Sequence, residues 1–285
     1  MSGFPPRYVV AFIDLLGMGR QFEDIPEFPN GKADEECFDA PFMRVLQFRE
    51  SLSTMKNSIE KQLPESQKRI SGMQNEDQAT IQKYFKAKVG LEFIGDSGML
   101  NVCLVDDQHA APLKSILSLV SQLSVEMLSH LSMGAPLRGG ISVGRCSQED
   151  SGLIGQAVAR AYRLESKVAR YPRIVIHESL KQYLDEAEGV ARKNTSKLES
   201  CAELTLVGSI RDLIDTDQDG CLILDYLGVL SKVGLRNDCL LPTVCRFIEE
   251  SFKGFEKSGN LELKGRYQKL INYFKKKECW IVESA

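Results

Sequence analysis

The sequence predicts an α+β fold, an α/β sandwich on a ferredoxin-like βαββαβ core, and three observations support this. Residues 7–14 form a run of Val, Ile and aromatic side chains that is typical of a strand. Two more strand-like runs, 88–95 and 98–105, flank a short Gly-containing turn and predict a hairpin. A long amphipathic segment, 111–132, follows the hairpin and leads into a further strand at 137–144.

An insertion that contains a helix is predicted between the first strand and the hairpin, over about 23–85. Residues 23–40 are acidic and contain prolines, so we expect a surface loop there. Apolar residues recur at helical spacing over 41–62 and predict a helix. Residues 63–80 are polar and are expected to form a loop or a frayed helix.

A second core helix at about 155–169 and a strand at 173–177 complete the core, which we place within residues 1–185. Residues 186–285 are expected to complete the same domain with a C-terminal strand and helical extension. The predicted elements there are strands at 203–208 and 221–227, and one or two helices over 241–278.

Composition limits the classes of function. The chain has 285 residues, 43% of them hydrophobic, which is enough for a sizeable core. Its formal net charge of −3 argues against a nucleic-acid partner. The N-terminus does not resemble a signal peptide, and no apolar run approaches the ~20 residues that span a bilayer, so no membrane partner is expected. The eight cysteines include no CxxC pair, which favours free thiols in a cytoplasmic protein.

Two aspartates are the strongest candidates for a functional site. Asp14 ends the first strand, and Asp96 lies in the turn of the predicted hairpin. A carboxylate at the buried end of a strand is costly unless a positive group meets it. In a ferredoxin-like sheet the first strand lies beside the hairpin, so a shared divalent metal site is one interpretation. The alternative is that both residues only stabilise turns.

The sequences around these aspartates resemble those of the class III nucleotide cyclases. The first aspartate lies in 12–17 (FIDLLG), and the second lies in a Gly-Asp turn, 95–97 (GDS). An Arg-Gly-Gly strand follows at 138–144 (RGGISVG), and the next helix carries a Gly…Ala-x-Arg-Leu-Glu pattern from Gly155 to Glu165. The resemblance covers roughly residues 7–185. The whole chain is similar to the bacterial Pycsar cyclases, which make cyclic pyrimidine nucleotides in anti-phage defence.

The resemblance implies roles for individual residues. Asp14 and Asp96 would bind two Mn²⁺ or Mg²⁺ ions per site, with the backbone carbonyl of Leu15 as a further ligand. Phe12 and Gly17 would contact the substrate. The ions would hold a nucleoside triphosphate and help to deprotonate its ribose 3′-hydroxyl, which would attack the α-phosphorus and release pyrophosphate.

The resemblance also implies a homodimer with composite sites. Class III cyclases carry an Asn and an Arg one helical turn apart, which act from the partner protomer. The matching positions are Ala159 and Arg163, so the Arg is present and the Asn is not. Gln156 and Arg160 have the same spacing and offer a substitute pair. The alternative is that both arginines are surface charges, or that one pairs with Glu165.

The substrate expected from the resemblance is UTP, converted to 3′,5′-cyclic UMP that a downstream effector senses. Adenylate cyclases read the purine with a Lys and an Asp, and the matching positions hold Gly90 and Gly152, with Asp150 close by. An ATP or GTP cyclase is therefore disfavoured. Two alternatives stay open: a cytidylate cyclase that makes cyclic CMP, and an inactive cyclase-like domain that binds a nucleotide or partner. A phosphodiesterase or polymerase-like enzyme shares the two-metal chemistry, but the motifs at 138–144 and 155–165 disfavour it.

The acidic run at 215–220 matches the first half of a calcium-binding EF-hand loop. The last ligand position of such a loop holds Tyr226 where a Glu is required. We therefore predict that this run is a turn between two strands. The run Lys275-Lys276-Lys277 is predicted to be a solvated helix end, with a triphosphate contact as the alternative.

Overall fold

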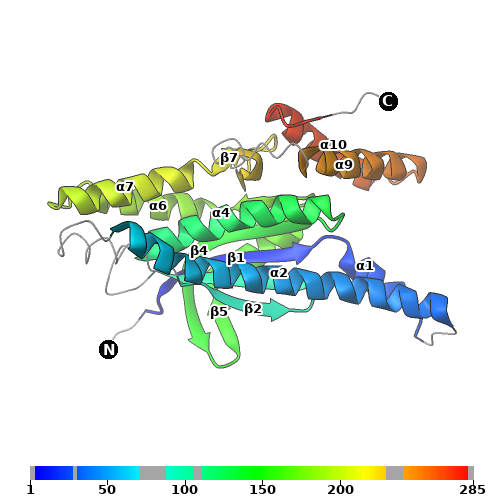
Figure 1. Ribbon diagram of the computed structural model, residues 1–285, viewed down its shortest axis with the longest axis horizontal. Helices are drawn as coiled ribbons and strands as arrows, with labels where there is room; N and C mark the ends of the chain where they lie inside the picture. The colour runs from blue at the N-terminus through cyan, green and yellow to red at the C-terminus, as the bar shows by residue number, and fades with distance from the viewer. Residues whose placement is uncertain (1–3, 28–30, 71–87, 105–110, 229–239, 282–285) are drawn as a thin grey trace.

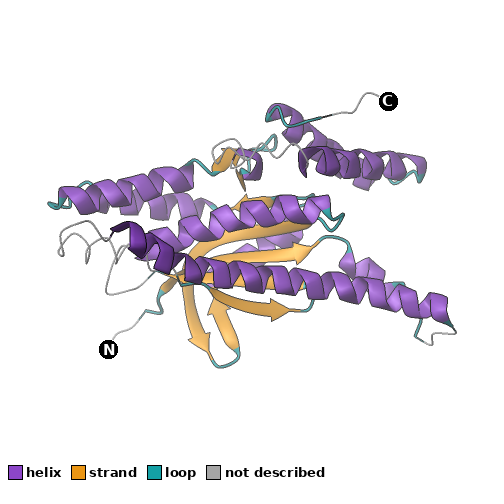
Figure 2. Cartoon of the chain, in the orientation of Figure 1, coloured by secondary structure: helices purple, strands orange, loops and turns teal. Residues whose placement is uncertain are grey.

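A computed structural model of the chain describes residues 4–27, 31–70, 88–104, 111–228 and 240–281. The described strands form one eight-stranded sheet with helices packed on it (Figures 1 and 2), which confirms the predicted α+β sandwich. The strands are β1 (Arg7–Leu15), β2 (Gly90–Ile94), β3 (Ser97–Cys103), β4 (Leu137–Glu149), β5 (Gly152–Gly155), β6 (Ile174–Ile176), β7 (Ile214–Thr216) and β8 (Leu222–Leu224).

The helices lie mostly on one side of this sheet. In chain order they are α1 (Met18–Glu23), α2 (Lys32–Ile70), α4 (Ala111–Ser132), α5 (Gln156–Arg163), the π-helical turn η1 (Leu164–Val168), α6 (Glu178–Ala191), α7 (Lys197–Arg211), α9 (Leu240–Lys257) and α10 (Leu261–Lys276).

The sheet has the topology that the βαββαβ pattern predicts. Its strand order is β2-β3-β1-β4-β6-β8-β7, and β5 pairs with the outer part of β4. The first strand, β1, lies at the centre of the core between β3 and β4 and runs antiparallel to both. The hairpin of β2 and β3 extends the sheet on one side, and β6 joins β4 in parallel on the other.

The alternation of side chains along β1 divides the core into two layers. Val9, Ala11 and Ile13 belong to the larger hydrophobic cluster, beneath α2 and α4, which lie in front of the sheet in Figure 1. Tyr8, Val10 and Phe12 belong to a smaller cluster on the opposite face, where α5 contributes small side chains, Ala157 and Ala161. A strand that is apolar on both faces must be covered on both faces, and β1 is covered in this way.

The C-terminal elements share this core. The strands β7 and β8 extend the same sheet, and buried side chains of α9 and α10 belong to the larger cluster. Residues 217–220 of the acidic run form the predicted turn between two strands, and the first two residues of the run belong to β7. Asp217 and Asp219 in that turn both accept hydrogen bonds from the buried side chain of Arg173, which precedes β6. Lys277 pairs with Asp225 at 2.5 Å.

Two predicted elements are wrong. Residues 203–208 lie within α7, not in a strand: Leu, Thr and Val suggested a strand, but Glu203, Val207 and Ile210 are buried at helical spacing. Ser196 caps this helix by accepting a hydrogen bond from the amide of Glu199. The predicted loop at 23–40 is mostly helical, because α2 begins at Lys32.

Other boundaries also differ from the prediction. The predicted 41–62 helix is the middle of α2, which continues to Ile70, and residues 71–80 lie outside the described part of the chain. The strand β4 continues past Gly144 and folds back as β5, and α1, β5, α6 and β7 were not predicted. None of the described helices is long and apolar enough to cross a membrane. The described cysteines are free thiols.

Candidate active site

Asp14 and Asp96 lie on different strands, and the strand register brings them together. Asp14 is opposite Ser97 in the β1–β3 pair, and Asp96 directly precedes Ser97 in the β2–β3 turn. Asp14 is also opposite Arg138 in the β1–β4 pair. Because side chains alternate along strands, Asp14, Ser97 and Arg138 all lie on the face of the sheet that α5 covers.

The carboxylate of Asp14 is buried and has polar contacts at both oxygens. Asp14 is 8% exposed. The Ser97 hydroxyl donates a hydrogen bond to Asp14 Oδ1 at 2.9 Å. The Arg138 guanidinium donates to Oδ2 from Nε at 3.2 Å and from Nη2 at 3.1 Å. Arg138 therefore supplies the positive group that a buried carboxylate at a strand end requires.

A second buried carboxylate, Glu165, shares the same guanidinium. Glu165 lies in η1, directly after α5, and is 3% exposed. Its Oε1 lies 2.6 Å from Arg138 Nε. From the sequence, Arg160 or Arg163 was considered as the partner of Glu165. Neither pairs with Glu165, whose partner is Arg138 on β4. The negative charge of Asp96 also raises the pKa of both buried acids. The site thus contains one cation and three carboxylates.

Burial dominates the electrostatics of this group. It raises the pKa of Asp14 above its ordinary value, although Arg138 and the Ser97 hydrogen bond favour the ionised form. Burial also raises the pKa of Glu165, to about 7; Arg138 opposes this rise, and Asp14 and Asp96 add to it. The site therefore has excess negative charge when its carboxyls are ionised, and it binds protons readily near neutral pH.

This donor set fits a hard divalent cation. Mg²⁺ and Mn²⁺ prefer oxygen ligands and are often held by one or two carboxylates together with substrate phosphates. The described residues contain no group of three or more His, Cys, Asp or Glu side chains arranged for a metal. Asp14 and Asp96 are instead a two-carboxylate set, and the backbone carbonyl of Leu15 follows Asp14 directly in the chain.

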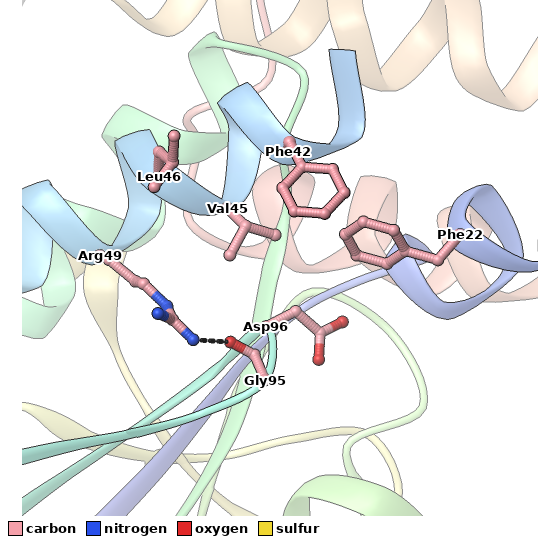
Figure 3. A pocket seen from close by; sticks show the side chains of 7 residues that line it. All are labelled: Phe22, Phe42, Val45, Leu46, Arg49, Gly95 and Asp96. Carbon is pink, nitrogen blue, oxygen red and sulfur yellow. Dashed lines mark hydrogen bonds between the residues drawn. The ribbon is translucent and has the colours of Figure 1, made fainter. Parts of the chain in front are cut away.

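The turn that carries Asp96 is fixed by a residue from α2. Gly95 has a φ of 61°, which a glycine adopts without strain. Arg49 donates a hydrogen bond from Nη2 to the Gly95 carbonyl at 2.6 Å, and its guanidinium lies 5.3 Å from the centre of the Phe93 ring. Arg49 thus holds the tip of the hairpin against α2 (Figure 3).

An apolar pocket opens beside Asp96. It has a volume of about 330 Å³. The rings of Phe22 on α1 and Phe42 on α2 meet edge to face at its wall, with centroids 5.5 Å apart (Figure 3). The side chains that line it are Phe22, Phe42, Val45, Leu46 and Arg49, together with the turn residues Gly95 and Asp96.

The helix α5 presents a solvent-exposed side near this site. Arg163 is exposed and pairs with no acid among the described residues, and Ala159 is exposed one turn before it. Arg160 behaves differently, because its Nη1 donates a hydrogen bond to the Val143 carbonyl of β4 at 3.2 Å. Arg160 is therefore engaged within its own protomer, whereas Arg163 is available to another molecule.

The remaining predicted residues surround the end of β1. Gly17 is exposed, has a φ of 88° and forms the turn from β1 into α1. Phe12 is 5% exposed, and its ring packs edge to face on Tyr162 of α5, with centroids 5.4 Å apart. The ring of Phe12 thus belongs to the contact between α5 and the sheet.

The comparisons with known proteins found no relative of this chain. A scan of protein-family models and a search of curated proteins both end without a match. The cyclase resemblance therefore depends on the motifs and on the geometry that they adopt.

Four residues of the site were not predicted: Arg49, Ser97, Arg138 and Glu165. Arg138 and Glu165 stand within the motifs that carry the resemblance, so their positions were visible in the sequence but their pairing was not. Ser97 is adjacent to Asp96. Arg49 lies on a helix far from the turn in sequence, and no local pattern indicates its contact with Gly95.

Proposed function

We propose that the chain is a metal-dependent nucleotide cyclase. The observation that carries the proposal is the adjacency of Asp14 and Asp96 at the end of β1, in an acidic site that lies within the cyclase-like motifs. The reaction would be intramolecular attack of the ribose 3′-oxygen of a nucleoside triphosphate on its α-phosphorus. A 3′,5′-cyclic nucleotide forms and pyrophosphate leaves.

The residues of this chain would contribute mainly position and charge. Bound Mn²⁺ or Mg²⁺ would neutralise the triphosphate and lower the pKa of the 3′-hydroxyl. Asp14, Asp96 and the Leu15 carbonyl would hold these ions in place. Ser97 would orient Asp14 through its hydrogen bond to Oδ1. The backbone at Gly17 and the end of β1 near Phe12 would bound the substrate.

The proposed enzyme works as a homodimer in which each site uses two protomers. The exposure of Arg163 supports this, because a charge without an acidic partner among the described residues can serve a neighbouring molecule. Arg163 of one protomer would stabilise charge on the substrate held by the other. Arg160 is a poorer candidate because it already binds Val143 of its own β4.

The proposed substrate is UTP, and the product would act in the cytoplasm as a signal for an effector in anti-phage defence. The resemblance to Pycsar cyclases and the absence of purine-reading side chains at Gly90 and Gly152 support this choice. CTP is the alternative substrate. A domain that binds nucleotide without turnover is the second candidate function, and the exposed Ala159 at the Asn position favours it.

The deciding experiment is incubation of the protein with each of the four ribonucleoside triphosphates and Mn²⁺, with detection of pyrophosphate and cyclic product. We expect cyclic UMP from UTP. Cyclic CMP would select the cytidylate alternative, and no product from any substrate would overturn the enzyme proposal. Mn²⁺ binding without product would favour the inactive nucleotide-binding domain.

The metal ligands are tested separately by Asp14→Ala and Asp96→Ala. Each should abolish Mn²⁺ binding, measured by calorimetry without nucleotide, as well as turnover. Glu250→Ala, which removes an exposed carboxylate from α9, is the matched control and should change neither. Retention of normal Mn²⁺ binding by both aspartate variants would show that the metal ligands are assigned wrongly.

A further inference from the structure

Arg138 contacts two carboxylates from different elements, through hydrogen bonds to Asp14 and through an ion pair with Glu165 that lacks hydrogen-bond geometry. Its Nε lies 2.6 Å from Glu165 Oε1 in η1 and 3.2 Å from Asp14 Oδ2 in β1, while Nη2 also donates to Asp14 Oδ2 at 3.1 Å. The shorter contact is to Glu165, which is the more deeply buried acid. The Arg138 side chain is a quarter exposed.

This arrangement conflicts with a cation at Asp14. Oδ1 already accepts a hydrogen bond from Ser97, and Oδ2 is the oxygen that Arg138 occupies. A divalent ion bound at Oδ2 would lie beside the guanidinium, and like charges repel strongly at such short range where water is scarce. The ion and Arg138 therefore compete for the same oxygen.

Glu165 offers Arg138 a partner that does not depend on Asp14. If the guanidinium leaves Oδ2, it can keep its contact with Glu165 and remain paired, so no buried charge is left alone. Without Glu165, Arg138 would have Asp14 as its only acidic partner among the described residues. Glu165 thus determines how easily Arg138 gives up Asp14.

We propose that Arg138 and Glu165 form an internal counter-ion that occupies Asp14 until a divalent cation displaces the guanidinium onto Glu165. This inference rests on the proposed metal site and adds a positioning role for two residues that do not bind the ion. In this arrangement Glu165 affects the affinity of the site for the ion only through its contact with Arg138.

A double-mutant cycle of Mn²⁺ affinity tests this dependence. Calorimetry without nucleotide is carried out on the wild type, Arg138→Gln, Glu165→Gln and the double variant. We expect Arg138→Gln to tighten binding and Glu165→Gln to weaken it, each on the order of tenfold. In the Arg138→Gln background, Glu165→Gln should have little further effect.

The cycle separates displacement from simple charge effects. If the two residues acted only through their charges, the two effects would add, and additivity would overturn the inference. The cycle is repeated at two alkaline pH values, so that proton uptake by Glu165 does not imitate the coupling. Arg145→Gln is the control. Arg145 is a cation on the same strand whose side chain donates to the Pro5 carbonyl, so its removal should leave Mn²⁺ affinity unchanged.

Two further outcomes have a defined meaning. If Arg138→Gln does not fold, as judged by its thermal unfolding, Arg138→Met replaces it in the cycle; methionine also removes the charge that pairs with Glu165, so non-additivity is again expected and additivity would overturn the inference. If the wild type binds no Mn²⁺, the proposed metal site fails together with the inference. Normal wild-type binding with additive effects overturns the inference alone.

Discussion

At the scale of single residues, the site depends on how a buried negative charge is neutralised. Asp14 is ionisable, almost inaccessible to water and close to two further acids. Arg138 is the cation that contacts both buried acids, and its position opposite Asp14 follows from the β1–β4 register. A lone carboxylate at this strand end would be too costly, so the residue opposite it matters as much as the aspartate itself.

The raised pKa of Glu165 predicts a pH dependence of stability. A group whose pKa is raised on folding stabilises the protein below its unfolded value of 4.5, and this contribution disappears as pH rises through about 7. The full shift corresponds to roughly 3 kcal/mol. In metal-free protein, the unfolding free energy relative to that of Glu165→Gln should therefore fall between about pH 5 and 8.

Denaturant titrations of both proteins across this range measure that difference. Comparison with Glu165→Gln is needed because buried His130 contributes a pH dependence of the opposite sign. The pKa of His130 is lowered to about 4, so its contribution to the unfolding free energy increases as pH rises. Parallel curves for the two proteins would contradict the raised pKa. Added Mn²⁺ should restore wild-type stability at the alkaline end.

At the scale of elements, α5 can reach the sheet because β4 carries glycines where the helix crosses it. A Cβ added at Gly140 would lie 2.5 Å from Leu164 Cβ and closer still to the Ala161 carbonyl oxygen. Both are fixed parts of the α5–η1 segment that carries Glu165 and Arg163. The absence of a side chain at Gly140 therefore allows the close approach that places Glu165 and Arg163 near Asp14.

Gly140→Ala should lower the unfolding free energy by roughly 2–3 kcal/mol, because backbone and Cβ atoms must separate. Gly189→Ala is the matched control. Gly189 lies inside α6 with no atom within 4 Å of an added Cβ, so alanine should be neutral or stabilising by up to about 1 kcal/mol. Equal effects of the two substitutions, measured by chemical denaturation, would contradict the close contact.

The β2–β3 turn is a second element whose placement has consequences for function. Arg49→Ala removes the hydrogen bond to Gly95 and the contact with Phe93, so the turn with Asp96 should shift. We expect turnover to fall on the order of tenfold to a hundredfold, since small displacements of catalytic groups have large effects. Arg44→Ala, on the exposed side of the same helix, should keep normal turnover and serves as control.

At the scale of the whole molecule, the C-terminal part is joined to the core by buried polar contacts as well as by apolar packing. Arg173 stacks on Tyr171, with its guanidinium 4.6 Å from the ring centre, and binds the β7–β8 connection through Asp217 and Asp219. Lys277, just after α10, binds Asp225 near β8. The Arg173 contacts attach residues beyond 185 to the start of β6, the strand that pairs with β4, and the Lys277 contact joins the end of α10 to the residue that follows β8.

The proposed composite site predicts complementation between inactive protomers. Asp14→Ala and Arg163→Ala should each abolish turnover, but an equal mixture should recover about a quarter of wild-type activity, because half of the dimers are mixed and each has one intact site. A mixture of Asp14→Ala with Asp96→Ala should recover nothing, since both residues belong to the same half of a site. No recovery in the first mixture would contradict action from the partner.

The sequence by itself determined the core strands, the hairpin, the helix at 111–132 and the two aspartates. These features depend on local periodicity and on turn residues, which neighbouring positions specify. Only the tertiary structure decided that residues 203–208 are helical, that Arg138 bridges Asp14 and Glu165, and that Arg49 holds the Asp96 turn. Those outcomes depend on burial and on pairing between distant segments, whose energies exceed local preferences.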